Sequence, residues 1–571
     1  MKEIKFDISE ERLLDIANTK FKDGNLRATL RLLHKKIELY GADTETLARL
    51  ADCYEVLELF EQATEYWMHY LDICDIDEEY EAFEGLMVCM LKLNNEKASS
   101  YYNTRVANLM DSNLTSKLQD EILEHEYLQK RSKISVVWPR ESQDFSEELA
   151  KGVKLLKAGH IHKAKEVFNA IPEGSSYQLT ALNYLTVASL LDGYLDIAEE
   201  NCKKALNIDA KNVVALTNYA AILHEQNKHD ESKEITKELL QVHTDEKEEL
   251  YKIAIICCEN GFYAEAFDRF QKLEENGELD HILLNFKAVS AFMCNKIDAS
   301  LYELSKLIDY YPNAYVARYF YEQISEYKKG KIEKANINFY YKLPEPEREQ
   351  RLDLLLSILE KKDDSEFSLS ENQFQKLFYW PFDENSEVTG QLQMIAIAVA
   401  SKLKKFDALK QLLYKMKIND EYKIEILRQM ALHNQPFEVG VNANGIFTKV
   451  YFQPLKIAKK RKKYFIQAQA LLFSRFAILG QYSILFNNTL QSIYKNLASN
   501  DNLELIDNAK DLACVAFITC LKANKEQVNR HIQFFDADAE KVNKILMRLD
   551  VAQNLQEVAM TEDNGEGYAT D

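Results

Sequence analysis

The sequence contains little glycine and proline: 16 Gly and 8 Pro are spread over 571 residues. β-Sandwiches and β-barrels need many turn residues, so this composition excludes them as the main architecture and favours helices with short connections. No apolar run approaches the roughly 20 residues that cross a bilayer, so we expect no membrane insertion. The first residues, MKEIKFDISEERLLDIA, contain acids and no apolar core, and therefore no signal peptide is expected.

The chain also lacks a basic excess and paired-cysteine motifs. Its net charge is −20, and attraction to phosphates requires a basic surface, which argues against general binding to nucleic acid or anionic membranes. None of the nine cysteines forms a C-x-x-C pair, and an odd number within helical segments is typical of reduced thiols. Since disulfides persist in oxidising compartments, we expect a cytoplasmic protein.

Catalytic and metal-binding motifs are missing as well. The sequence has no G-x-x-x-x-G-K-[ST], no G-x-S-x-G and no H-E-x-x-H. His160 and His162 are two residues apart, which suits neither a metal pair on one helix face nor a zinc finger. We therefore predict no catalytic residue, no cofactor, no metal and no enzymatic activity. An unrecognised enzyme within residues 387–553 is an alternative that this argument leaves open.

A spacing of 34 residues runs through the middle of the chain. One column holds only Gly or Asn, which enter the left-handed backbone region at helix C-termini: Gly159, Gly193, Asn227, Gly261 and Asn295. Five residues later stands a column of small residues: Ala164, Ala198, Ser232, Ala266 and Ser300. Further columns in the same register start at Gly152, Phe168 and Ile171. Each unit is predicted to be helix, tight turn and helix, and neighbouring units must stack to bury their apolar stripes.

These columns resemble the tetratricopeptide repeat family, whose 34-residue pattern places Leu-Gly, then A-x3-F, then Pro. The unit that starts at Lys247 matches it at Leu250, Ala254, Gly261, Ala266 and Phe270. The resemblance is strong over 145–312, moderate over 10–77 and weak at 78–111 and 313–342. It implies a helical-repeat solenoid. Beyond residue 386 the 34-residue spacing is lost, but amphipathic segments predict a C-terminal helical region, so the expected fold class is all-α. That region carries one small β-hairpin, predicted from the β-branched and aromatic residues around Asn444-Gly445.

The breaks in the pattern divide the chain into segments. We expect N-terminal repeat-like hairpins over 1–112, a helix and linker over 113–144, and the main array over 145–345. A helix and linker over 346–386 then lead to the C-terminal helical region over 387–553, with the hairpin near 437–452. Residues 554–571 are polar and acidic, and are expected to be disordered.

In the family that this sequence resembles, the first helix of each unit lines a concave surface. The matching places in this chain hold mostly apolar or amide side chains and no Lys or Arg: Asn183, Val187, Thr217, Tyr251, Ile255, Asn285, Val289 and Phe292. A carboxylate would find little charge there, so the lining suits an extended or helical segment with apolar anchors. The alternative is that the chain's own linker or C-terminal helices fill this groove.

One basic segment interrupts the acidic sequence. It contains Lys456, Lys459, Lys460, Arg461, Lys462 and Lys463. We predict a non-enzymatic scaffold or adaptor that binds a protein or peptide through the repeat groove. The alternative function is a regulator that contacts nucleic acid or an acidic partner through this segment. The simpler explanation is a helix start whose charges face water or dock on the acidic body of the same chain, and the sequence does not determine the oligomeric state.

Overall fold

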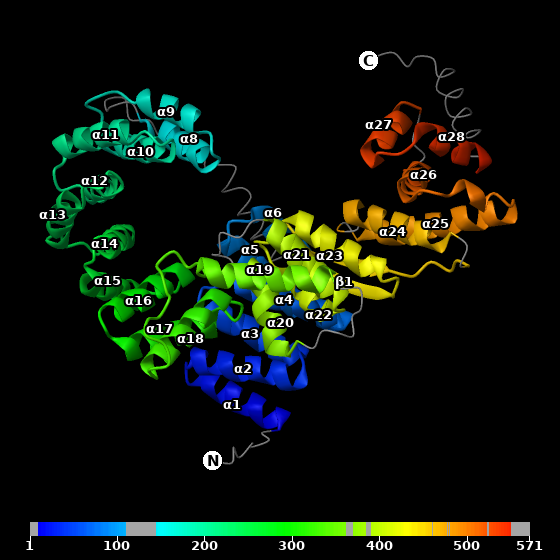
Figure 1. The fold of residues 1–571 in the computed structure, drawn as a ribbon, viewed down its shortest axis with the longest axis horizontal. Helices are drawn as coiled ribbons and strands as arrows, with labels where there is room; N and C mark the ends of the chain where they lie inside the picture. The colour runs from blue at the N-terminus through cyan, green and yellow to red at the C-terminus, as the bar shows by residue number, and fades with distance from the viewer. Residues whose placement is uncertain are drawn as a thin grey trace. The chain divides into compact units, whose positions relative to one another are not determined.

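The computed structural model describes residues 9–109, 144–360, 369–383, 390–458, 461–476, 478, 480–521 and 525–549 (Figure 1). The chain forms two compact units. The first comprises residues 1–122 and 345–571, and the second comprises residues 123–344. Within the described residues, no helix combines the length and apolarity needed to span a membrane.

The second unit consists of paired antiparallel helices. Their bounds are α8 Ser146–Lys157, α9 Ile161–Asn169, α10 Gln178–Leu191, α11 Leu195–Ile208, α12 Val213–Glu225, α13 His229–Leu240, α14 Lys247–Glu259, α15 Tyr263–Glu275, α16 His281–Met293, α17 Ile297–Tyr310 and α18 Tyr315–Lys328. In Figure 1 the pairs follow one another along an arc, with α10, α12 and α14 on its inner side and α11, α13 and α15 on its outer side.

The 34-residue columns have the predicted structural roles. Every member of the Gly/Asn column has a positive φ, between 57° at Asn295 and 84° at Gly261, so the first helix of each repeat ends in the left-handed turn that the spacing requires. The small residues Ala164, Ala198, Ser232, Ala266 and Ser300 are all fully buried at 0% exposure. The chain therefore has the tetratricopeptide-like architecture that the sequence predicts.

A hydroxyl in the small-residue column also links the two helices of a unit. Ser232 Oγ donates to the carbonyl of Ala220, and Ser300 Oγ donates to the carbonyl of Ala288, both at 2.7 Å. Each acceptor belongs to the column that starts at Gly152, in the first helix of the same repeat. Close backbone approach is what brings these atoms within hydrogen-bond range, so a small side chain is required there.

Replacing Ala266 with Leu should therefore lower the free energy of unfolding by about 1–3 kcal/mol, because the larger side chain overpacks the α14–α15 crossing. The matched control is Ala264→Leu, an exposed position on the same helix. Thermal unfolding followed by circular dichroism measures both. Equal melting temperatures for the two variants would contradict the packing described here.

Beyond α18 the weak repeat predicted at 313–342 is only half formed. The first helix is present, but residues 331–344 are irregular and form no second helix. Asn338 explains part of this difference. Its Nδ2 donates to the carbonyl of Lys342 and its Oδ1 accepts from the Lys342 N–H, so the side chain closes a loop in place of helical hydrogen bonds.

The first unit begins with three helix pairs. They are α1 Glu10–Lys22 with α2 Leu26–Tyr40, α3 Thr44–Val56 with α4 Phe60–Ile73, and α5 Glu79–Lys92 with α6 Glu96–Leu109. Its later helices are α19 Glu345–Glu360, α20 Glu371–Tyr379, α21 Gly390–Lys402, α22 Phe406–Tyr414, α23 Asp420–Leu432, α24 Lys462–Phe476, α25 Gln481–Ser499, α26 Ala509–Leu521, α27 Lys525–Phe535 and α28 Ala539–Arg548. The last five pack around a shared apolar core that includes Phe465, Phe486 and Phe517.

The predicted β-hairpin is confirmed. Strands β1 Phe437–Ala443 and β2 Ile446–Phe452 pair antiparallel, with Ala443 opposite Ile446 and a two-residue turn between them. Asn444 and Gly445 have φ of 53° and 89°, as the twist of a tight hairpin demands. An isolated hairpin is marginal in water, and this one packs on helices.

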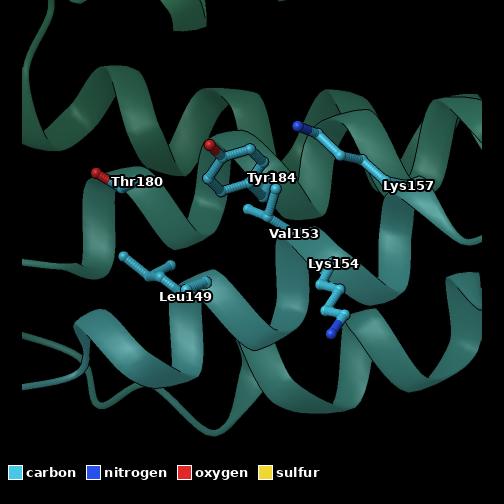
Figure 2. A pocket seen from close by; sticks show the side chains of 7 residues that line it. Leu149, Val153, Lys154, Lys157, Thr180 and Tyr184 are labelled. Atoms are coloured by element: carbon cyan, nitrogen blue, oxygen red, sulfur yellow. The ribbon is translucent and has the colours of Figure 1, made fainter. Parts of the chain in front are cut away.

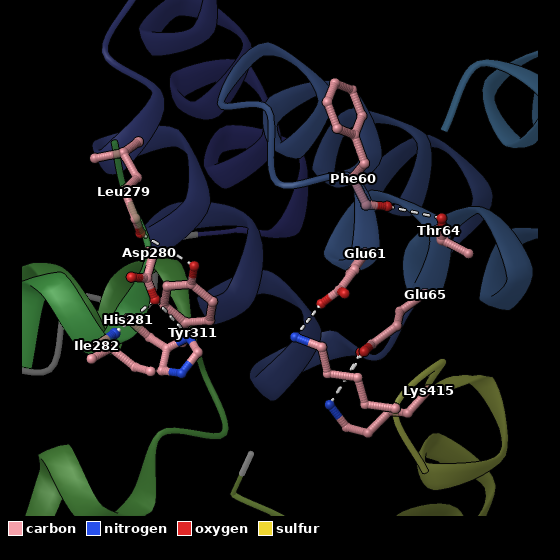
Figure 3. Close-up of polar contacts among 11 residues, drawn as sticks. Phe60, Glu61, Thr64, Glu65, Leu279, Asp280, His281, Ile282, Tyr311 and Lys415 are labelled. Atoms are coloured by element: carbon pink, nitrogen blue, oxygen red, sulfur yellow. Dashed lines mark hydrogen bonds and ion pairs between the residues drawn. The ribbon is translucent and has the colours of Figure 1, made fainter. Parts of the chain in front are cut away.

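The hairpin docks on the N-terminal helices of the same unit. At its tip, the buried Tyr102 hydroxyl donates to the Gly445 carbonyl at 2.9 Å and accepts from the Phe447 N–H at 2.7 Å. Midway along β1, Asp72 at the end of α4 accepts from the Gly440 N–H at 2.7 Å. Nearby, Lys415 reaches Glu65 of α4 at 3.2 Å (Figure 3). Residues more than 300 positions apart in sequence thus share one packed unit.

Candidate functional site

A pocket of about 520 Å³ lies between α8 and α10, in the second unit (Figure 2). We call it the α8–α10 pocket, and its lining is Leu149, Ala150, Val153, Lys154, Lys157, Thr180 and Tyr184. Leu149 and Val153 are one helical turn apart, so both face the same side of α8. These two side chains make the pocket floor apolar. The ammonium groups of Lys154 and Lys157 and the hydroxyls of Thr180 and Tyr184 can form hydrogen bonds with the backbone of a bound peptide.

Packing beneath the pocket fixes its shape. The Tyr184 ring stacks on Phe168 with 5.2 Å between centroids and an interplanar angle of 12°. Phe168 itself fits against Gly152, where an added Cβ would lie 2.4 Å from the ring. The glycine therefore lets α8 and α9 approach closely, and the buried Phe168 holds Tyr184 in place at the pocket.

The pocket is locally basic on an acidic chain. Residues 150–165 contain five Lys and no Asp or Glu, whereas the whole chain has a net charge of −20. Lys154 and Lys157 are exposed, and neither has an ion-pair partner among the residues that the structure describes. By contrast, Lys165 Nζ forms an ion pair with Asp192 Oδ2 at 2.7 Å. The pocket therefore combines apolar contact with two cations available to an acidic ligand.

The groove residues predicted from the sequence are either half-buried or buried. Val187, Tyr251, Ile255 and Phe292 are half-buried. Burial, assisted by nearby Asp280 and Cys258, raises the pKa of Tyr251 to about 12, so its hydroxyl stays protonated. Asn183 is also half-buried, and its Nδ2 donates at 3.1 Å to Asn212, which caps α12.

The remaining predicted groove residues are buried. Thr217 is 4% exposed and its hydroxyl donates to the Val213 carbonyl of its own helix. Val289 is 2% exposed and Asn285 is 0% exposed. Asn285 Nδ2 donates at 3.2 Å to the Phe339 carbonyl, so a segment of the chain itself occupies this part of the surface.

The groove predicted from the sequence does not include Lys154, Lys157, Thr180 or Tyr184, because these residues do not stand at the places that line the concave surface in the family. The run of five Lys without an acid over 150–165 was visible in the sequence and would have drawn attention to this end of the array.

The basic segment lies elsewhere, in the first unit. Lys456 is exposed, and its backbone N–H and carbonyl both bond the side chain of Gln491 on α25, at 2.8 and 3.0 Å. Lys463 is exposed, while Arg461 and Lys462 are half-buried. The predicted residues Lys459 and Lys460 lie outside the described residues.

Metal and thiol chemistry have little support in the described part of the chain. No group of three or more His, Cys, Asp or Glu side chains there could hold a metal ion. Burial raises the pKa of the adjacent Cys257 and Cys258 to about 12, so neither is a thiolate near neutral pH.

Comparisons with known proteins found structural likeness only. No family model and no curated protein matches the sequence. A tetratricopeptide repeat protein from Parabacteroides merdae is similar over 51% of this chain and 100% of that chain, with 17% identity and a TM-score of 0.28. Yeast Tom70 is similar over 96% of this chain and 99% of that chain, with 14% identity and a TM-score of 0.29.

A third solved structure is a human IFIT1 dimer with PPP-AAAA. It is similar over 75% of this chain and 92% of that chain, with 13% identity and a TM-score of 0.26. At such TM-scores and identities, none of these likenesses assigns a ligand or a residue role to this chain.

Proposed function

We propose that this protein is a non-enzymatic scaffold that binds a segment of another protein at the α8–α10 pocket. The partner segment presents one aromatic or branched apolar side chain with Asp or Glu residues beside it. The apolar side chain enters between Leu149, Val153 and Tyr184, and the carboxylates pair with Lys154 and Lys157. We place the protein in the cytoplasm, where cysteines that are not joined in disulfides, as all nine are here, are usual.

The observation that carries this proposal is the pairing of an open apolar pocket with exposed lysines on an otherwise acidic protein. Apolar burial supplies affinity, while charge complementarity selects among partners and speeds association. A longer partner segment would continue toward the predicted groove residues Val187, Ile255 and Phe292, which are half-buried on α10, α14 and α16.

Panning a random 12-residue peptide library against the full-length chain tests the proposal without knowledge of the natural partner. Enriched peptides should combine acidic residues with an apolar anchor. Enrichment of basic or uncharged polar peptides, or of none above background, would contradict it.

Charge reversal on α8 gives a quantitative prediction. Lys154→Glu with Lys157→Glu should weaken binding of the enriched peptide by about tenfold, because two exposed charge pairs of up to about 1 kcal/mol each become repulsive. Fluorescence anisotropy measures the dissociation constant. The control is Lys151→Glu, an exposed lysine of the same helix that does not line the pocket. An equal effect from this control would indicate general attraction and not a site.

A further inference from the structure

The irregular segment after α18 lies against α16 and the start of α15. The Phe339 ring stacks on Phe286 with 5.4 Å between centroids and an angle of 29°, and it is nearly parallel to Tyr263 at 5.9 Å. Tyr341 is 3% exposed and lies 6.4 Å from the His281 ring. Between these two anchored rings, Tyr340 is 80% exposed. The segment thus turns at Phe339–Tyr340, with a φ of 53° at Tyr341, and contacts α16 through the two rings on either side of Tyr340.

Asn285 holds the backbone of this segment by only one of its two polar atoms. Its Nδ2 donates to the Phe339 carbonyl, but its Oδ1 is buried without a hydrogen-bond partner among the described residues. An unsatisfied buried acceptor costs free energy. A ligand that supplied both a carbonyl and an N–H would satisfy this amide completely, which the resident segment does not do.

We propose that Tyr263, Asn285 and Phe286 form a second binding site, the α16 site, for a peptide segment that presents an aromatic side chain at a tight turn. Residues 335–343 are its resident ligand, and a partner segment with an aromatic anchor displaces Phe339 from it. The aromatic ring supplies stacking with Phe286 and Tyr263, and the backbone satisfies both polar atoms of Asn285. This site is separate from the α8–α10 pocket, so failure of peptide panning at that pocket leaves it untouched.

The proposal is tested by releasing the resident segment and offering it back in trans. The probe is a fluorescent synthetic peptide of residues 332–344, added to the full-length chain. The variant Phe339→Ala with Tyr341→Ala removes both anchoring rings and should bind the probe at least about tenfold more tightly than the parent chain, whose site is occupied. Adding Asn285→Ala to that variant should weaken the binding again.

The control is Tyr340→Ala, which removes the exposed ring between the two anchors and should behave like the parent chain. Absence of probe binding by a double variant with parental helical content would overturn the proposal. If the double variant loses helical content, probe binding is measured with Phe339→Leu instead, because leucine keeps the apolar bulk of the side chain without the ring stacking. Probe binding by this variant above the parent level supports an exchangeable site. Absence of probe binding by this variant would show that the segment is a fixed part of the fold.

Discussion

Replacing Lys287 with Met is expected to lower the local free energy of unfolding of α15–α17 by about 3–5 kcal/mol, the usual cost of breaking a buried ion pair by removing one partner. Lys287 of α16 is 4% exposed. Its Nζ lies 2.6 Å from Glu274 Oε2 of α15 and 3.1 Å from Glu303 Oε1 of α17. Lys306 pairs with the same two carboxylates, at 2.8 Å from Glu303 Oε2.

Two cations and two anions thus balance one another between the neighbouring helix pairs α14–α15 and α16–α17. Burial acts to raise the pKa of Glu274, but hydrogen bonds from Lys287 and Lys306 overcome it and hold that pKa below its ordinary value. A carboxyl with a depressed folded-state pKa stabilises the fold above its unfolded pKa, and this contribution is lost as the pH falls through the folded pKa. Without Lys287, two buried carboxylates share one ammonium group.

Hydrogen–deuterium exchange of peptides from α15–α17 measures the local opening free energy in the intact chain. The compensated control is Lys287→Met with Glu303→Leu, which removes one charge of each sign and leaves Lys306 paired with Glu274. It should cost less than Lys287→Met alone. Protection within about 1 kcal/mol of the parent for the single variant would refute a stabilising role for this cluster.

Replacing Asp72 with Ala is expected to free the β-hairpin from α4 at a cost of about 3 kcal/mol, because two hydrogen bonds to a charged group are lost. Asp72 Oδ1 accepts from the Gly440 N–H at 2.7 Å and its Oδ2 accepts from the Tyr414 hydroxyl at 2.6 Å. Tyr414 is 5% exposed, so its hydroxyl would be left buried without this partner.

The measurement is amide exchange in peptides that cover β1 and β2. Faster exchange is expected in Asp72→Ala, while Asp75→Ala, an exposed acid just beyond the end of α4, should match the parent. Identical protection in both variants would show that Tyr102 and the apolar contacts hold the hairpin without help from Asp72.

The repeat register could be predicted from the sequence because it depends on local chemistry that recurs. Gly261 and Asn227 must adopt positive φ, and Ala266 must admit a neighbouring backbone, so each unit repeats the same requirement in the same place. The hairpin was equally visible, since Asn444-Gly445 favours one type of turn between alternating apolar residues.

The remaining features of the fold and of the candidate sites depend on contacts that the repeat spacing does not predict. The partners Asp72 and Gly440 are 368 residues apart, and nothing in either local sequence specifies the other. Gly330 and Ala335 continue the repeat pattern with a shift of one residue, yet Asn338 and the stacking of Phe339 stabilise an irregular path over 331–344. The predicted groove residue Asn285 therefore binds the chain itself. The α8–α10 pocket arises from side chains of two helices, which a single column of the repeat cannot show.

Photo-crosslinking of the panned peptide tests the binding site most directly. The apolar anchor of the peptide is replaced by benzoylphenylalanine, the complex with the full-length chain is irradiated, and the attachment sites are mapped by mass spectrometry. Our account predicts crosslinks within residues 149–157 and 180–184, and their loss in the Lys154→Glu, Lys157→Glu variant. Crosslinks concentrated in the basic segment at 456–463, or spread over helices outside the pocket and unchanged in that variant, would contradict it.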